Sequence, residues 1–270
     1  MPVPSTAGVD EHLLGQVSEV VEEAGAVLLG RRTAYARGTG LDELVAEVEA
    51  NDRAVLDVMK APLLELRPEA RWAEDELAGG ALPDGEWWVA DPAEGNINHV
   101  HGMPEWAVTA TLVHDNVPVL TATHLPLAGE LYTALAGGGA HLDGEPLRVS
   151  AKTDLGAAIT GTAQARPGES ETALRTIGDS VTAMMTAGLL VRVSVPATLH
   201  LLNVAAGRMD AFFQFSDVRA DKVAGALLVA EAGGTVTDLR GRPWTAASPD
   251  FLAAAPGIHE QARRVLAPLA

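Results

Sequence analysis

One short stretch constrains the fold of this chain more than any other: residues 87–98, which read Trp-Trp-Val-Ala-Asp-Pro-Ala-Glu-Gly-Asn-Ile-Asn. A run of strand-forming residues leads to Asp91, and the proline that follows cannot donate to a sheet, so we expect the strand to end there in a tight turn. The turn would bring Asp91 and Glu94 to the same point. Gly95 allows a close approach to the backbone, and Asn96 is typical of a helix start, whose N–H groups bind anions. Two carboxylates beside such a backbone predict a site for Mg²⁺ and a phosphate group.

Length and composition limit the class of protein and its partners. The chain has 270 residues, 47% of them hydrophobic, so it can bury a large core in one large domain or two closely joined ones. A formal net charge of −17 repels nucleic acids and anionic membranes, and the lack of cysteine excludes disulfides, a thiolate nucleophile and cysteine-bound zinc. No apolar run approaches the roughly 20 residues of a membrane span, and the N-terminal residues do not resemble a secretory signal. We therefore expect a soluble, cytoplasmic protein without nucleic-acid or membrane partners.

Hydrophobic periodicity divides the chain into elements. Apolar residues at helical spacing predict helices over residues 11–30 and 42–59, followed by a connection over residues 61–71. Alternating apolar residues over 106–149 predict a meander of antiparallel strands. From residue 157 onward, predicted strands and helices alternate. The pattern favours an α/β fold that is of the α+β type in its N-terminal part.

The change of pattern also predicts how the chain is divided. We expect an N-terminal α+β subdomain over residues 1–150, with the antiparallel sheet, and a C-terminal α/β subdomain over residues 151–270. No Pro/Ser-rich linker separates them.

Four blocks of the sequence resemble the inositol monophosphatase family. Residues 91–98 are similar to the family signature Asp-Pro-Ile/Leu-Asp-Gly-Thr-x-Asn, and residues 221–234 to its Trp-Asp-x-Ala-Ala-Gly and Glu-Ala-Gly-Gly block. Residues 73–75 resemble its Gly-Glu-Glu element, and residues 43–49 its Asp-Leu-Val-Thr-x-x-Asp element. Because the blocks occur in family order and at family spacing, the resemblance covers nearly the whole chain.

The resemblance implies a layered αβαβα sandwich, with the active site at the junction of the two subdomains. It also implies Mg²⁺-dependent hydrolysis of a phosphomonoester by a homodimer. The metal ligands it implies are the carboxylates of Glu74, Asp91, Glu94 and Asp221 and the carbonyl oxygen of Ala93. Backbone N–H groups of Gly95 and Asn96 would bind phosphate at a helix start.

Several positions depart from the family pattern. Asn96 and Glu49 stand where the family has the Thr and Asp that orient and deprotonate the attacking water. Asparagine has no hydroxyl with which to relay a proton, so we expect Glu49 to be the base and Asn96 to orient the water. Gln214 takes the place of an acid that binds substrate hydroxyls, and Lys222, beside the last metal ligand, is a candidate pocket cation. With Gly95 and Asn96, these two residues form the expected substrate-binding set.

The resulting hypothesis is a Mg²⁺-dependent phosphatase for a small phosphomonoester, such as a sugar, cyclitol or nucleotide phosphate, in a specialised pathway such as antibiotic biosynthesis. Two alternatives stay open. The chain could keep the metal site and carry out non-hydrolytic chemistry on a phosphorylated substrate, or it could bind a phosphorylated ligand without catalysis.

Overall fold

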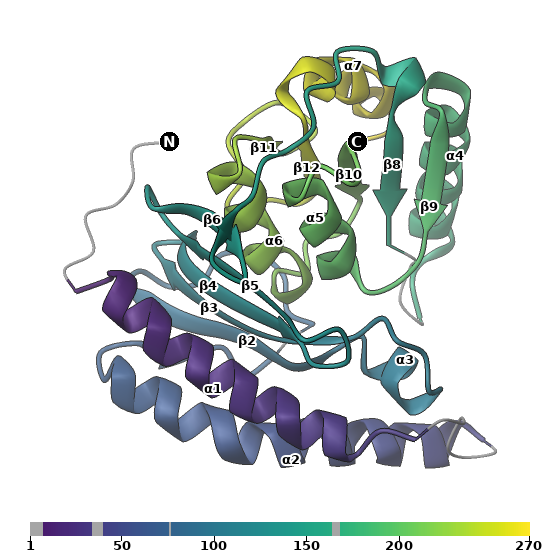
Figure 1. Cartoon of the computed structure of the whole chain (residues 1–270). Helices are drawn as coiled ribbons and strands as arrows, with labels where there is room; N and C mark the ends of the chain where they lie inside the picture. Colours follow the sequence, from purple (N-terminus) through teal and green to yellow (C-terminus); the bar gives the residue numbers. More distant parts are fainter. Residues whose placement is uncertain (1–7, 34–39, 76, 164–167) are drawn as a thin grey trace.

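Two long helices form the first layer of the fold. The computed structural model describes residues 8–33, 40–75, 77–163 and 168–270. Helix α1 (Glu11–Gly30) begins where the Asp10 carboxylate accepts a hydrogen bond from the Leu13 N–H, and it lies along α2 (Leu41–Leu66) (Figure 1). The inner faces of both helices are apolar and pack together on the first sheet.

Helix α2 is longer than its sequence predicts. The expected connection over residues 61–71 is wrong, because α2 continues through Pro62 to Leu66. Met59 and Leu63 are fully buried on the face that packs in the core. Their burial outweighs the loss of the one backbone hydrogen bond that Pro62 cannot donate.

The second layer is a seven-stranded sheet that runs in sequence order from β1 to β7. Its strands are β1 (Arg71–Trp72), β2 (Glu86–Glu94), β3 (Ala107–His114), β4 (Val117–Leu125), β5 (Glu130–Leu135), β6 (Gly139–Leu142) and β7 (Glu145–Pro146). Only β1 and β2 pair in parallel, so the predicted antiparallel meander is confirmed. Because side chains alternate along a strand, Trp88 belongs to the core with α1 and α2, whereas Val89 belongs to the core on the opposite face.

Strands and helices alternate in the second half of the chain, as predicted. They are β8 (Ile159–Thr162), α4 (Glu171–Ala187), β9 (Leu190–Val193), α5 (Ala197–Ala205), β10 (Ala211–Gln214), α6 (Ala220–Glu231), β11 (Thr235–Thr237), β12 (Phe251–Ala254) and α7 (Pro256–Leu266). The strands form a second sheet in the order β11-β12-β10-β8-β9.

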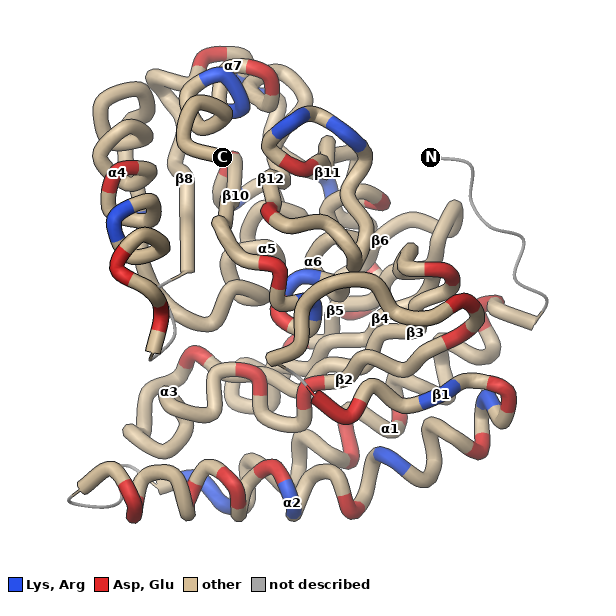
Figure 2. Tube along the Cα trace, turned by 180° about the vertical axis from the view of Figure 1, so that it is seen from behind, with Lys and Arg blue, Asp and Glu red and all other residues tan. Residues whose placement is uncertain are grey.

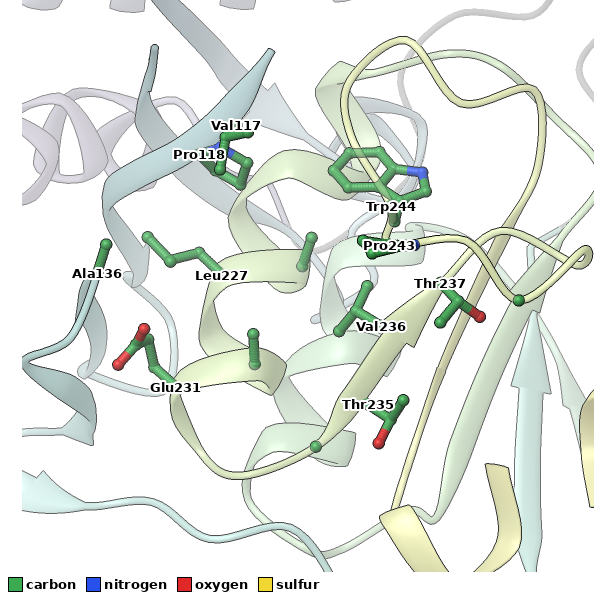
Figure 3. A pocket seen from close by; sticks show the side chains of 14 residues that line it. Val117, Pro118, Ala136, Leu227, Glu231, Thr235, Val236, Thr237, Pro243 and Trp244 are labelled. Carbon is green, nitrogen blue, oxygen red and sulfur yellow. The ribbon is translucent and has the colours of Figure 1, made fainter. Parts of the chain in front are cut away.

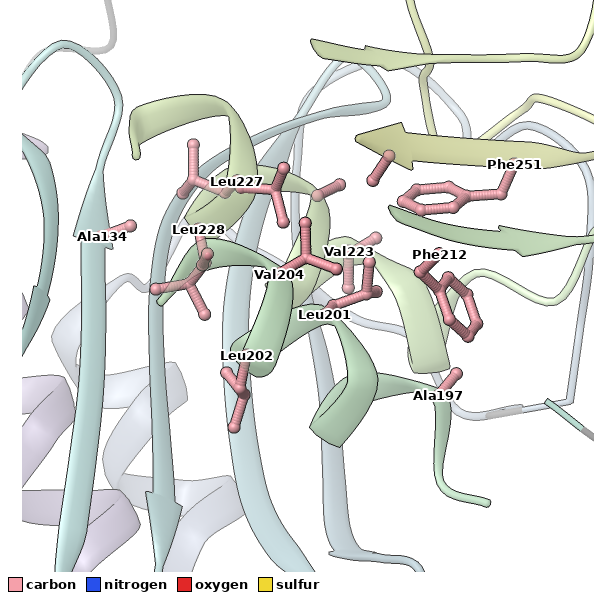
Figure 4. Packing of buried hydrophobic residues seen from close by; sticks show 14 of the residues in the cluster. Ala134, Ala197, Leu201, Leu202, Val204, Phe212, Val223, Leu227, Leu228 and Phe251 are labelled. Atoms are coloured by element: carbon pink, nitrogen blue, oxygen red, sulfur yellow. The ribbon is translucent and has the colours of Figure 1, made fainter. Parts of the chain in front are cut away.

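Helices α5 and α6 lie between the two sheets. In Figure 4, Leu201 and Val204 of α5 pack beside Val223 and Leu227 of α6, and Phe212 of the second sheet closes the cluster. Helices α4 and α7 cover the other face of the second sheet (Figure 1). The layers are thus α1–α2, first sheet, α5–α6, second sheet and α4–α7, which confirms the predicted αβαβα sandwich.

The surface of this sandwich is acidic. Helix α2 alone carries seven acidic and two basic residues, and red segments outnumber blue ones along it in Figure 2. Within the described residues, no helix has both the length and the apolar character needed to cross a membrane. The first sheet ends at Pro146 and the second begins at Ile159; the boundary between subdomains at residue 150 stays a prediction.

Candidate active site

The candidate site lies where β2 meets the short helix α3 (Asn96–Val100). The expected end of the strand at Pro92 is wrong, since β2 extends to Glu94. Its pairing with β3 shifts between Asp91 and Glu94, and this irregularity accommodates a proline that cannot donate to the ladder. The Ala93 N–H donates to the Asp91 carboxylate at 2.9 Å and fixes the side chain at the bulge.

Gly95 connects β2 to α3 in a conformation that favours glycine. Its φ is 80°, and a Cβ atom added there would lie 2.7 Å from the carbonyl oxygen of Glu105. The side chain of Asn98 donates to that same oxygen at 2.9 Å. The missing side chain at Gly95 therefore lets α3 close against Glu105, and the binding of phosphate by the Gly95 and Asn96 N–H groups stays a prediction.

The Asn96 amide binds helix α2. Its Nδ2 donates to Asp52 Oδ1 at 2.6 Å and to the Val48 carbonyl at 3.0 Å, while its Oδ1 accepts from Asn51 Nδ2 at 2.8 Å. Both amide protons are used within the protein. Asn96 thus holds the Asp52 carboxylate in one place.

Glu49, the predicted base, is not the carboxylate that Asn96 contacts, and its catalytic role stays a prediction. The Glu49 side chain is exposed, and the carboxylate that contacts Asn96 belongs to Asp52, three residues later. At 100° per residue, Asp52 is only about 40° from the inward-facing Val48 around the helix, whereas Glu49 is about 100° away. Helical periodicity was therefore the signal in the sequence that could have found Asp52. The family motif did not find it, because the motif was matched to Glu49.

Burial and neighbouring negative charge raise the pKa values of two carboxyl groups. Burial raises the pKa of Asp52 to about 6, against a lowering by the Asn96 hydrogen bond, and the charge of Glu49 raises it further. The pKa of Asp91 rises to about 7 because of burial and the charges of Asp52 and Asp221. The charges of Asp52 and Asp221 therefore act on Asp91, although the three residues come from α2, β2 and α6.

Thr198 links two of the predicted metal ligands, and the sequence did not single it out. It is fully buried on α5. Its Oγ1 lies 2.8 Å from Glu94 Oε2 and 3.2 Å from the carbonyl oxygen of Asp221. The hydroxyl thereby joins the end of β2 to the start of α6.

The Asp221 carboxylate accepts a hydrogen bond at each oxygen. Lys222 Nζ donates to Oδ1 and Gln214 Nε2 donates to Oδ2, each at 3.1 Å. The Lys222 side chain is 0% exposed and its ammonium group contacts Asp221; its role as a pocket cation stays a prediction. The Oε1 of Gln214 is buried and has no partner among the described residues, and its contact with a substrate hydroxyl stays a prediction.

The structure places Glu74 outside this group. Its side chain is 74% exposed, and both carboxylate oxygens accept from Lys60 Nζ, at 2.7 and 2.9 Å. Strand β1 is two residues long, and the segment after it directs Glu74 to Lys60 on α2.

A buried network behind Asp52 was also absent from the sequence-based site. Asn51, fully buried, donates to Asn96 and, at 3.0 Å, to His99 Nδ1, while its Oδ1 accepts from Arg31 Nε at 2.7 Å. His99 Nε2 lies 3.0 Å from the Leu28 carbonyl, so the ring donates there and accepts at Nδ1. The two N-terminal helices and α3 are thus locked together next to Asp52.

The donor set suits a hard divalent cation in its chemistry. Asp52, Asp91, Glu94 and Asp221 offer carboxylate oxygens. The raised pKa values at Asp52 and Asp91 reflect burial first and then neighbouring negative charge, which a cation would offset. In the described part of the chain, however, no three His, Cys, Asp or Glu side chains are close enough together to hold a metal ion as they stand.

A pocket lies elsewhere, at the far end of α6 (Figure 3). Leu227, Val236 and Trp244 line it with mostly apolar surface. Glu231, also in its wall, accepts from the N–H groups of Gly137 and Gly139 at 2.9 and 3.0 Å. The glutamate of the second sequence block therefore fixes the turn between β5 and β6 and has a role separate from that of the carboxylate cluster.

Comparisons with known proteins identify the family and support the fold. The model of the inositol monophosphatase family matches residues 9–268. The "Probable inositol 1-monophosphatase ImpA" of Mycobacterium tuberculosis is 33% identical over 94% of this chain and 96% of its own. An inositol-1-monophosphatase of Rhizobium meliloti is 33% identical over 72% of this chain and 73% of its own. The solved structure of Mycobacterium tuberculosis SuhB has a TM-score of 0.78 at 28% identity and covers 96% of each chain.

Proposed function

Because the chain belongs to the inositol monophosphatase family, we propose that it is a Mg²⁺-dependent phosphatase that hydrolyses a small phosphomonoester. The observation that carries the proposal is the 2.6 Å contact between Asn96 and Asp52, next to Asp91. It fixes a carboxylate of raised pKa beside the residues that would hold the metal. This is the arrangement needed for a base that deprotonates water near a phosphate.

Each residue has a defined part in the proposed reaction. Bound Mg²⁺ would neutralise phosphate charge and lower the pKa of a coordinated water. Asp91, Glu94 and the Ala93 carbonyl offer its ligands, and Thr198 orients Glu94. Asp52, with a pKa raised to about 6, is mostly ionised at neutral pH and can accept the proton of the attacking water.

Asn96 positions the base. Because both of its amide protons bind Val48 and Asp52, its side chain fixes Asp52 and does not relay a proton. Gln214 offers its free Oε1 to a hydroxyl of the substrate. These features support a sugar, cyclitol or nucleotide phosphate as substrate, and we further propose a cytoplasmic homodimer that acts in a specialised biosynthetic pathway.

Phosphate release from a panel of small phosphomonoesters, with and without Mg²⁺, tests the activity. On the best substrate, we predict that Asp52→Asn lowers kcat by ~10²–10⁴ with little change in KM, because losing a general base costs about that much. Glu49→Gln is the matched control: it removes a charge from the same helix, but from an exposed side chain, and should keep nearly the wild-type rate.

Two results would contradict the proposal in different ways. If Glu49→Gln loses the activity and Asp52→Asn keeps it, the base is Glu49 and the role of Asp52 is wrong. If wild type releases no phosphate from any compound but is thermally stabilised by one of them, the chain binds a phosphorylated ligand without hydrolysing it.

A further inference from the structure

Lys222 is an unusual residue in the interior of this protein. Lysine is almost never fully buried unless it is paired, and the Lys222 side chain is 0% exposed. It stands in the first turn of α6, directly after Asp221, and its Nζ lies 3.1 Å from Asp221 Oδ1. This is the one contact of its ammonium group recorded among the described residues. The buried positive charge of Lys222 is therefore paired with Asp221, a predicted metal ligand.

The ammonium group and a metal ion would compete for the same carboxylate. Asp221 Oδ1 already accepts from Lys222 and Oδ2 from Gln214, each at 3.1 Å. A divalent ion bound to either oxygen would lie within a few ångströms of the ammonium group. Because Lys222 is enclosed, little water is available to screen the repulsion between two cations.

The charges of the site point the same way. Four carboxylates form the candidate cluster, those of Asp52, Asp91, Glu94 and Asp221. Glu74, which was also predicted as a metal ligand, is bound at both oxygens by Lys60 and is 74% exposed. With Lys222 offsetting Asp221, fewer negative charges are left for metal ions than the sequence motifs predict.

We propose that the Lys222 ammonium group is a built-in cation that takes the place of one divalent metal ion at Asp221. The proposal rests on the metal-dependent function proposed above and specifies it: the wild-type site holds one metal ion fewer than the same site without the ammonium group. Lys222 is then a positioning residue that acts through Asp221.

Counting bound Mn²⁺ tests the proposal without measuring activity. Mn²⁺ has the same preference for oxygen ligands as Mg²⁺, and its free form is counted by electron paramagnetic resonance. We expect Lys222→Met, which keeps the length and removes the charge, and Lys222→Gln, which keeps a donor for Asp221, to bind one Mn²⁺ more per chain than wild type. Lys152→Met is the matched control, because Lys152 pairs with Asp210 at 2.7 Å, outside the site, and its loss should leave the count unchanged.

A further variant covers the case in which these proteins do not fold. Asp221→Asn combined with Lys222→Met removes both partners of the buried pair, so that no unpaired buried charge is left. It should bind as many Mn²⁺ ions as wild type, since Asp221 carries no metal ion in wild type.

The counts also show which result would overturn the proposal. An equal count in wild type and the Lys222 variants would show that the ammonium group does not take the place of a metal ion. The loss of one Mn²⁺ in the double variant would show that Asp221 binds metal despite Lys222. Phosphate release by Asp52→Asn is measured separately, so a failure of the proposed hydrolysis is distinguishable from a failure of the metal count.

Discussion

The carboxyl groups of Asp52 and Asp91 lie in surroundings that favour their protonated forms. Burial and neighbouring charge raise their pKa values to about 6 and about 7, above the value of about 3.9 for an unfolded Asp. A pKa that is raised by folding adds stability that is fully present below the unfolded pKa and is lost as the pH rises through the folded pKa. The metal-free protein should therefore lose stability between about pH 4 and about pH 7 through these two residues.

At a pH above the pKa values of these two carboxyl groups, protons no longer compete with Mg²⁺ for the carboxylate oxygens. Metal binding should therefore restore the lost stability at such a pH. We predict that Mg²⁺ raises the Tm more at about pH 8 than at about pH 5. At this chain length, each kcal/mol of added stability corresponds to about 2–4 °C. Thermal unfolding with and without Mg²⁺ at both pH values measures the effect.

The control for this prediction is Asp91→Asn, which removes the group with the higher pKa. It should make the Mg²⁺-induced shift smaller and less dependent on pH. Equal shifts of the wild-type Tm at the two pH values would mean that neither carboxylate exchanges a proton for the metal.

Site residues were predictable from the sequence where they lie within one short motif. Asp91 and Glu94 lie in one motif at the end of a strand, so their neighbourhood follows from local geometry. Asp52 required helical periodicity as well as a motif, because Glu49 matches the motif but points to solvent. The pairing of Glu74 with Lys60 was not predictable, since it depends on how β1 is placed against α2.

At the scale of elements, the turn between β2 and α3 depends on Gly95. Two effects combine there: a φ of 80°, and a Cβ position only 2.7 Å from the Glu105 carbonyl oxygen. The first effect is shared by Gly129, whose φ is 69° but whose Cβ position has no atom within 4 Å. A comparison of Gly95 with Gly129 therefore separates the effect of backbone strain from the effect of the close approach to Glu105.

We therefore predict that Gly95→Ala lowers the free energy of unfolding by more than Gly129→Ala does. Strain at a positive φ costs about 1–3 kcal/mol in both variants, and only Gly95→Ala must also displace the backbone of Glu105. Urea unfolding of the two variants gives the difference. Equal losses would show that the turn has room for a methyl group and that only φ requires glycine.

Periodicity predicted whether an element is a helix or a strand, but the predicted ends of two elements that contain a proline were wrong. Pro92 predicted the end of a strand, and Pro62 falls in the segment predicted as a connection, but both lie inside an element. In α2 the buried Leu63 extends the apolar face past Pro62. In β2 a shift of register removes the need for a hydrogen bond at Pro92. Such compensation depends on packing with distant segments, which local sequence does not reveal.

At the scale of the whole molecule, the layered architecture restricts where a second copy could bind. The meander leaves neither face of its sheet free for a second copy, because α1–α2 cover one face and α5–α6 the other. The second sheet, in contrast, ends at β9, an edge strand with exposed apolar side chains at Leu190 and Val193. Met185 of α4 and Leu189 beside it are each 65% exposed.

An apolar edge strand beside an apolar helix end is a surface that proteins usually cover. We predict that the chain forms a homodimer through β9 and the end of α4, and that Leu190→Glu converts it to a monomer of 28.1 kDa in light scattering. The control is Leu127→Glu, in the turn between β4 and β5, which introduces the same charge at an exposed leucine of the first sheet and should leave the dimer intact.

A wild-type monomer at micromolar concentration would rule out the dimer, whereas a dimer that survives Leu190→Glu would place the interface on another face. Because the charge is introduced far in the fold from Asp52 and Asp91, the Leu190→Glu monomer also shows whether Mg²⁺ binding needs the second copy.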